Sequence, residues 1–113
     1  MKTIDIHSHF YPDSFPDLDT RFGDGDWPGF RKVSDEKGMI TLGGEDYRPI
    51  YDACWKGERR IEEMDKYAVD VQIMCATPIL FAYEKPARQA LECAKVINDE
   101  ALRLCSHNPA RLK

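Results

Sequence analysis

A pair of histidines near the N-terminus constrains this chain more than any other feature. In residues 3–9, Ile4 and Ile6 alternate with polar residues, so the pattern predicts a strand that carries His7 and His9 on the face opposite the isoleucines. Same-face neighbours on a strand are about 6.5–7 Å apart at the backbone, which two imidazoles can bridge around an ion with Zn–N bonds of about 2.0–2.1 Å. We therefore expect His7 and His9 to bind a metal ion. The alternative is a solvated or hydrogen-bonded pair at the end of a strand.

Composition excludes several classes of function. The chain has 113 residues, of which 42% are hydrophobic and 32% charged, as in an ordinary soluble domain. Its net charge of −4, with acidic and basic residues interspersed, argues against a nucleic-acid partner. No apolar run is long enough to cross a membrane and no signal-peptide pattern begins the chain, so we expect a cytoplasmic protein without a membrane partner.

The four cysteines predict neither a zinc ribbon nor a disulfide framework. They are not arranged in a Cys-x-x-Cys pair, and they fall inside expected helices and strands. We expect free thiols in the core for Cys54, Cys75, Cys93 and Cys105.

The segment after the histidines, residues 11–29, is rich in proline, glycine and aspartate and is expected to be a solvated surface loop. Its acidic residues lack the spacing of a calcium-binding loop. These acidic residues are Asp17, Asp19, Asp24 and Asp26.

A small antiparallel β insertion is expected at residues 30–50. Short strands are predicted at residues 30–33, 39–42 and 46–50, and the last two are joined by Gly43-Gly44, which can adopt the positive φ angles of a tight turn.

The rest of the chain alternates helix and strand. Amphipathic spacing predicts helices at residues 57–67 and 86–106. In the first helix, Ile61, Met64 and Ala68 are expected to face the core, and Arg60 is among the charged residues expected to face water. A second strand is predicted at residues 69–77, and His107 is interpreted as a helix cap rather than a ligand.

Residues 111–113 are expected to begin a third strand. Alternating strands and helices predict parallel pairing, here between residues 2–7 and 69–75, with the antiparallel strands outside this pair. The fold class is therefore α/β: residues 1–113 are expected to be the N-terminal portion of a (β/α)₈ TIM-like barrel, about two βα units, because a complete barrel takes about 250 residues. Asp5 is expected on the face of His7 and His9, one step deeper, as an interior residue rather than a ligand.

Residues 4–10 resemble the opening strand of the amidohydrolase superfamily, and three further stretches resemble one family within it, the 2-amino-3-carboxymuconate-6-semialdehyde decarboxylases. The similarity covers nearly the whole chain and is weakest at residues 13–30. The stretches are Tyr47-Arg48-Pro49-Ile50-Tyr51 with Cys54-Trp55, Arg60-Ile61-Glu62-Glu63-Met64-Asp65, and Val69-Asp70-Val71-Gln72 followed by Cys75-Ala76-Thr77-Pro78 and Phe81.

The resemblance implies a distorted (β/α)₈ barrel, a Zn²⁺ ion, and loss of CO₂ without an organic cofactor, in tryptophan (kynurenine) or nitroaromatic catabolism. Carried over by position, His7 and His9 are two zinc ligands and Arg48 binds a substrate carboxylate, for which a guanidinium offers two parallel donors. Without the resemblance, Arg48 is a surface arginine on a hairpin. The other ligands and the catalytic histidine and aspartate come from later strands, so no catalytic residue is assigned in this chain.

Three functions remain open. In the first, the parent protein is a zinc-dependent decarboxylase whose substrate is a small-molecule carboxylate, 2-amino-3-carboxymuconate 6-semialdehyde. In the second, it is another metal-dependent hydrolase or hydratase of the superfamily, and in the third the chain is a non-catalytic fragment or interaction module. A homodimer is one option for the parent protein.

Overall fold

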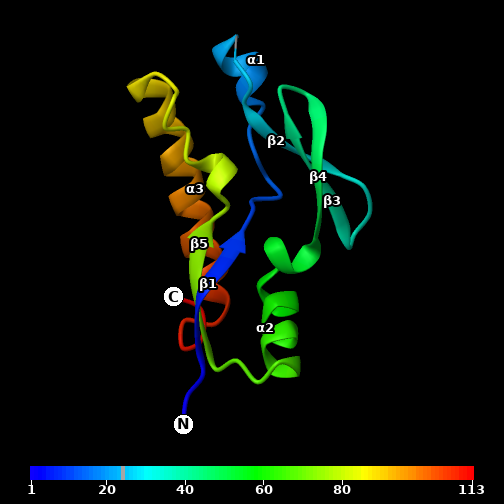
Figure 1. Ribbon diagram of the computed structural model, residues 1–113, viewed down its shortest axis with the longest axis vertical. Helices are drawn as coiled ribbons and strands as arrows, with labels where there is room; N and C mark the ends of the chain where they lie inside the picture. The colour runs from blue at the N-terminus through cyan, green and yellow to red at the C-terminus, as the bar shows by residue number, and fades with distance from the viewer. Residues whose placement is uncertain (24) are drawn as a thin grey trace.

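The computed structural model describes residues 1–23 and 25–113, so Asp24, one of the four acidic residues considered above, lies outside the described residues. The molecule is elongated, 49 × 30 × 19 Å. A pair of parallel strands stands beside two helices, and a separate antiparallel sheet extends to one side (Figure 1). The α/β fold class is confirmed.

The parallel pair consists of β1 (Ile4–Phe10) and β5 (Val71–Ala76). The predicted third strand begins on the far edge of β5, where Leu112 forms a parallel bridge with Gln72. The Gln72 amide donates to the carbonyl of Arg111 at 2.8 Å, and the Lys113 amide donates to the carbonyl of Gln72 at 3.0 Å. The strands therefore lie side by side in chain order, as successive parallel units require.

An extra residue in β1 changes which side chains share a face. Asp5 pairs with Gln72 and Ser8 pairs with Met74, so β1 advances by three residues where β5 advances by two. Because Gln72 and Met74 share a face of β5, their partners Asp5 and Ser8 share a face of β1, and His9 lies on the other one.

Two sequence predictions are thereby wrong. Asp5 does not share the face of His9, and Ile4, which precedes Asp5 in the regular part of the strand, does share it. The physical reason is the bulge, because one additional residue inverts the alternation of every position beyond it.

The antiparallel sheet has the order β2-β3-β4, with β2 at Pro28–Lys32, β3 at Lys37–Leu42 and β4 at Glu45–Tyr51. All three predicted strands are present, and none of them pairs with β1 or β5. Gly43 and Gly44 join β3 to β4 with φ angles of 58° and 83°, which suit glycine.

The prediction of a solvated loop at residues 11–29 is wrong. Tyr11, Leu18 and Trp27 are almost completely buried, and Leu18 begins a short helix, α1 (Leu18–Phe22). Asp17 caps this helix by accepting hydrogen bonds from the backbone amide and the hydroxyl of Thr20. Apolar side chains anchor the segment to the core, and Asp17 and Asp19 accept hydrogen bonds from the backbone amides of Thr20 and Trp27.

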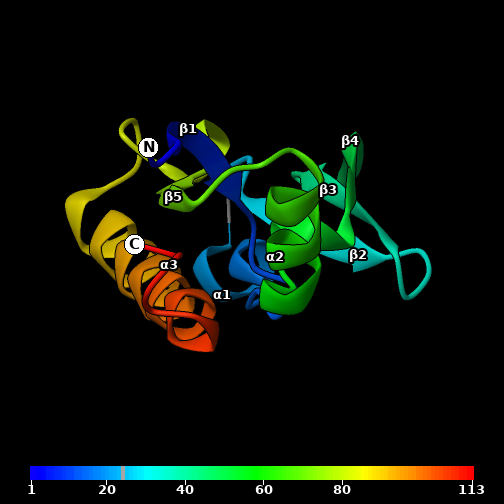
Figure 2. The same cartoon turned by 90° about the horizontal axis from the view of Figure 1, so that it is seen from below.

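Two longer helices, α2 (Gly57–Lys66) and α3 (Ala87–His107), follow the small sheet and β5, respectively. Short 3₁₀ turns precede them at Asp52–Cys54 and Pro78–Leu80. Figure 2 shows both helices on one side of the β1–β5 pair. The other side is open, and Ile4 and Ile6 are 55% and 76% exposed.

Helix α2 departs from its predicted orientation at two positions. Arg60, expected in water, is buried together with Gly57 and Met64. Ala68, expected in the core, lies beyond the end of the helix with a φ of 54° and is exposed.

The core forms where the end of β1, the loop with α1, the small sheet and α3 meet. Its buried members are Phe10, Tyr11, Leu18, Trp27, Ile40, Leu80, Cys93, Ile97 and Leu104. All four cysteines are free thiols, as predicted, although only Cys93 is fully buried. Among the described residues, the helices are too short or too polar to span a membrane.

Candidate metal centre

The imidazoles of His7 and His9 meet on one side of β1, as the sequence predicts. Their Nε2 atoms are 3.2 Å apart, and the rings are perpendicular, with centroids 5.0 Å apart. Two nitrogens bound tetrahedrally to zinc at about 2.0–2.1 Å are about 3.3–3.4 Å from each other. The pair therefore has the separation of two ligands on one edge of a zinc tetrahedron.

The second ring nitrogen of His9 is held by the neighbouring strand. Nδ1 lies 3.2 Å from the carbonyl oxygen of Ala76, which can only accept a hydrogen bond. In a neutral ring the proton is then on Nδ1, so the lone pair of Nε2 is directed toward His7. Metal-binding histidines in proteins are commonly oriented by such a bond to a carbonyl.

The two histidines do not complete a site. Within the part of the chain that the structure describes, no group of three or more His, Cys, Asp and Glu side chains is placed to hold a metal ion. A structural zinc site has four ligands, and a catalytic one has three from the protein. The residues present fit two positions of such a site on the open face of the strands.

The opposite face of β1 holds a polar network that the sequence analysis missed. Arg60 of α2 reaches the backbone of β1 and the side chain of Gln72, and Gln72 contacts Asp5. A signal was available in the sequence, because Arg60 precedes Met64 by four residues and therefore shares the buried face of the helix.

Arg48 lies on β4 and thus on a different sheet from the histidines. It pairs with Ile40, which also pairs with Phe30, so Arg48 shares the face that these two residues pack against the core. Its side chain is exposed, and its guanidinium is 5.9 Å from the ring centroid of Tyr47. The described structure does not bring Arg48 and the histidine pair into one site.

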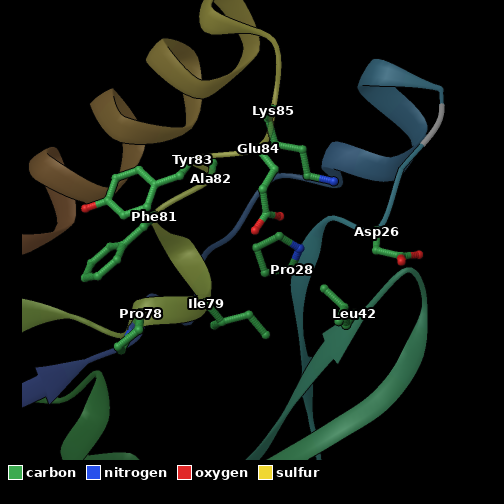
Figure 3. Close-up of a pocket in the computed structure, with 10 residues that line it drawn as sticks. All are labelled: Asp26, Pro28, Leu42, Pro78, Ile79, Phe81, Ala82, Tyr83, Glu84 and Lys85. Carbon is green, nitrogen blue, oxygen red and sulfur yellow. The ribbon is translucent and has the colours of Figure 1, made fainter.

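A cavity of about 370 Å³ opens beside the turn that follows β5 (Figure 3). Its wall combines apolar side chains with polar surface, and the charged groups of Glu84, Lys85 and Asp26 lie at one side. The Lys85 ammonium is 4.8 Å from the ring centroid of Trp27. The other lining residues are Pro28, Leu42, Pro78, Ile79, Phe81, Ala82 and Tyr83. The cavity includes neither histidine and was not predicted from the sequence.

Two curated proteins are similar to this chain over nearly its whole length. One, from Dictyostelium discoideum, is 32% identical over 108 residues, which cover 96% of this chain. The other, from Caenorhabditis elegans, is 32% identical over 115 residues, which cover 98% of it. Both are named 2-amino-3-carboxymuconate-6-semialdehyde decarboxylase. The resemblance to this decarboxylase family is confirmed.

The similarity is to a part of each decarboxylase, because the chain spans 30% and 28% of the length of these two relatives. No protein-family model matches the sequence. Among solved structures, the apo form of IDCase from Metarhizium anisopliae matches with a TM-score of 0.67 at 20% identity, over 98% of this chain and 33% of that one. The fold of this chain thus occurs as a third of a larger structure.

Proposed function

We propose that this chain is the N-terminal portion of a zinc-dependent, non-oxidative decarboxylase that acts on 2-amino-3-carboxymuconate 6-semialdehyde. The observation that carries the proposal is the 3.2 Å separation of the His7 and His9 Nε2 atoms, in a chain that is 32% identical to part of two decarboxylases of this name.

The arrangement of β1, β5 and Leu112 supports a partial (β/α)₈ barrel. The strands are parallel and lie in chain order, and both helices cover the same side, as the outer helices of a barrel do. The uncovered side holds the histidines and the exposed Ile4 and Ile6. In the complete barrel this side faces the interior, where later strands supply the remaining ligands.

His7 and His9 supply two imidazole ligands for the zinc ion. When bound, zinc lowers the pKa of coordinated water toward about 7 and polarises the substrate. His9 is already oriented by the carbonyl of Ala76, so it loses little freedom on binding.

Arg48 binds a carboxylate of the substrate. Its side chain is exposed on the face of the small sheet that turns toward the core. A guanidinium donates two parallel hydrogen bonds to a carboxylate and stays charged at every physiological pH. The ligand class is thus a small molecule with an acidic group.

The test uses the complete protein. The purified enzyme is stripped of metal with a chelator, reloaded with zinc, and assayed for CO₂ release from the semialdehyde. The proposal expects activity to vanish with the metal and to return with zinc. Metal-dependent hydrolysis or hydration of another substrate, without CO₂ release from this one, would instead support the second class of enzyme in the superfamily.

A further inference from the structure

Arg60 is a buried arginine whose hydrogen bonds go to neutral acceptors. Only 7% of its surface is exposed, and its Nη2 donates to the backbone carbonyl of His9 at 2.6 Å. Its Nη1 donates to Oε1 of Gln72 at 2.9 Å, whereas its Nε has no hydrogen-bond partner among the described residues. Burying a guanidinium without a paired carboxylate is costly.

The hydrogen bonds of Arg60 continue to the other histidine. Gln72 donates from Nε2 to Oδ2 of Asp5 at 2.9 Å. The other carboxylate oxygen of Asp5 accepts from the backbone amide of His7 at 3.0 Å. One connected set, Arg60, Gln72 and Asp5, therefore holds the N–H of His7 at one end and the C=O of His9 at the other.

This network lies where β1 needs support. The extra residue between Asp5 and Ser8 interrupts the regular ladder with β5, so His7 lies within the irregular segment and His9 lies just beyond it. A bulge leaves backbone groups without ladder partners and lets the strand bend. In this segment the carboxylate of Asp5 accepts from the amide of His7, and Arg60 donates to the carbonyl of His9. Both contacts come from the helix side, and the imidazoles lie on the other side.

We propose that Arg60 is a positioning residue that fixes the spacing of the two imidazoles. It acts directly on the carbonyl of His9, and it acts through Gln72 and Asp5 on the amide of His7. The inference rests on the proposed role of His7 and His9. It adds a residue of α2 that touches neither metal nor substrate. Arg60 acts on metal affinity through backbone geometry, and its effect is separable from folding.

The test is the binding of a Cu²⁺–iminodiacetate complex to this chain. The chelate leaves free positions on the copper, and two imidazoles at the correct spacing fill them together, whereas a single imidazole binds weakly. Affinity is measured by calorimetry, and copper electron paramagnetic resonance reports whether one or two nitrogens bind. Urea denaturation of each variant shows that it is folded under the binding conditions.

Three variants decide the question. Arg60→Met keeps the length of the apolar stem and should weaken chelate binding by about ten- to a hundred-fold, with a change from two-nitrogen to one-nitrogen spectra. Arg60→Lys should recover part of the affinity, because an ammonium reaches one acceptor and not both. Arg59→Met, on the neighbouring residue that pairs with Asp52, Glu62 and Glu63, is the matched control and should bind like the wild type.

The outcomes separate this inference from the proposed function. If His7→Ala or His9→Ala leaves chelate binding unchanged, the pair is not a ligand set and the proposed function loses its basis. If both histidines are needed but folded Arg60→Met binds like the wild type, the positioning role is wrong and the ligand assignment stands. If Arg60→Met does not fold, Gln72→Met is measured instead. It removes the link between Arg60 and Asp5 at a smaller side chain, and it should weaken chelate binding to the same extent.

Discussion

Gly57, the first residue of α2, lies directly against His107, the last residue of α3. A Cβ atom placed on Gly57 would be 2.7 Å from both the Cβ and the Cγ of His107. Real Cβ atoms do not approach other carbons so closely, so this contact between the two helix ends depends on the absence of a side chain at residue 57.

Gly57→Ala should therefore destabilise the protein. Overpacking a close contact costs about 1–3 kcal/mol, which exceeds the gain of up to about 1 kcal/mol in helix propensity from glycine to alanine. The free energy of unfolding in urea measures the difference. His107→Ala should be nearly neutral alone, since the side chain is exposed, and should recover part of the loss in the double variant because the Cγ contact is removed. A Gly57→Ala variant as stable as the wild type would show that the helix ends can separate freely.

Asp17 should contribute a pH-dependent part of stability. The backbone amide of Thr20, and then its hydroxyl, donate hydrogen bonds to the carboxylate and hold the pKa of Asp17 below its ordinary value of 3.8. A lowered pKa in the folded state means that the stabilisation is complete above the unfolded pKa and is lost as the pH falls through the folded pKa.

Asp17→Asn keeps a capping side chain but cannot ionise. Its disadvantage against the wild type should therefore shrink as the pH is lowered from about 6 to about 2.5. Urea unfolding across this range measures the difference in free energy. Asp99→Asn, at an exposed position of α3, is the charge-matched control. A difference between Asp17→Asn and the wild type that is constant with pH would contradict the assignment of the cap.

The order of the elements was predictable because it depends on local patterns. Alternation over residues 3–9, helical spacing over 86–106 and the Gly43-Gly44 turn each indicate an element without knowledge of its neighbours. The bulge in β1 was not predictable, since it is defined by register with β5, and no residue between Asp5 and Ser8 marks it. This is why the histidines were correctly paired but their face was wrongly assigned relative to Ile4 and Asp5.

The prediction of which polar and loop residues are buried failed for a related reason. Arg60 is buried because acceptors from two strands, the carbonyl of His9 and the amide of Gln72, meet at its guanidinium. Composition led to the error at residues 11–29, where acidic residues suggested a solvated loop although Leu18 and Trp27 are core residues. An isolated tryptophan in a polar segment indicates that the segment is anchored to the core.

His7→Ala tests the metal centre in this chain. Because only two protein ligands are present, zinc should bind weakly to the wild type, and His7→Ala should abolish even this binding. Calorimetric titration with Zn²⁺ measures it. The third histidine of the chain supplies the control, because His107→Ala should bind like the wild type. Tight, stoichiometric binding by the wild type would mean that other residues complete the site.

Arg48→Ala in the complete protein tests the assignment of the carboxylate-binding residue. The loss of a charge-assisted hydrogen bond costs about 1.5–3 kcal/mol, so kcat/KM should fall by about ten- to more than a hundred-fold. Zinc content should stay unchanged, since Arg48 lies on a different sheet from the histidines. Arg48→Lys should restore only part of the activity, because an ammonium cannot form two parallel bonds to a carboxylate.

Arg31→Ala is the matched control for Arg48→Ala. Arg31 lies on β2 of the same sheet, and because it is next to Phe30, its side chain is on the opposite face from Phe30 and Arg48. There it forms an ion pair with Asp46. Steady-state kinetics and metal analysis on the three alanine variants, including His7→Ala, should give three patterns: lost turnover with lost metal for His7, lost affinity with full metal for Arg48, and neither for Arg31. Wild-type kinetics for Arg48→Ala would identify Arg48 as a surface residue, and the proposed decarboxylase would lose the only substrate-binding residue assigned in residues 1–113.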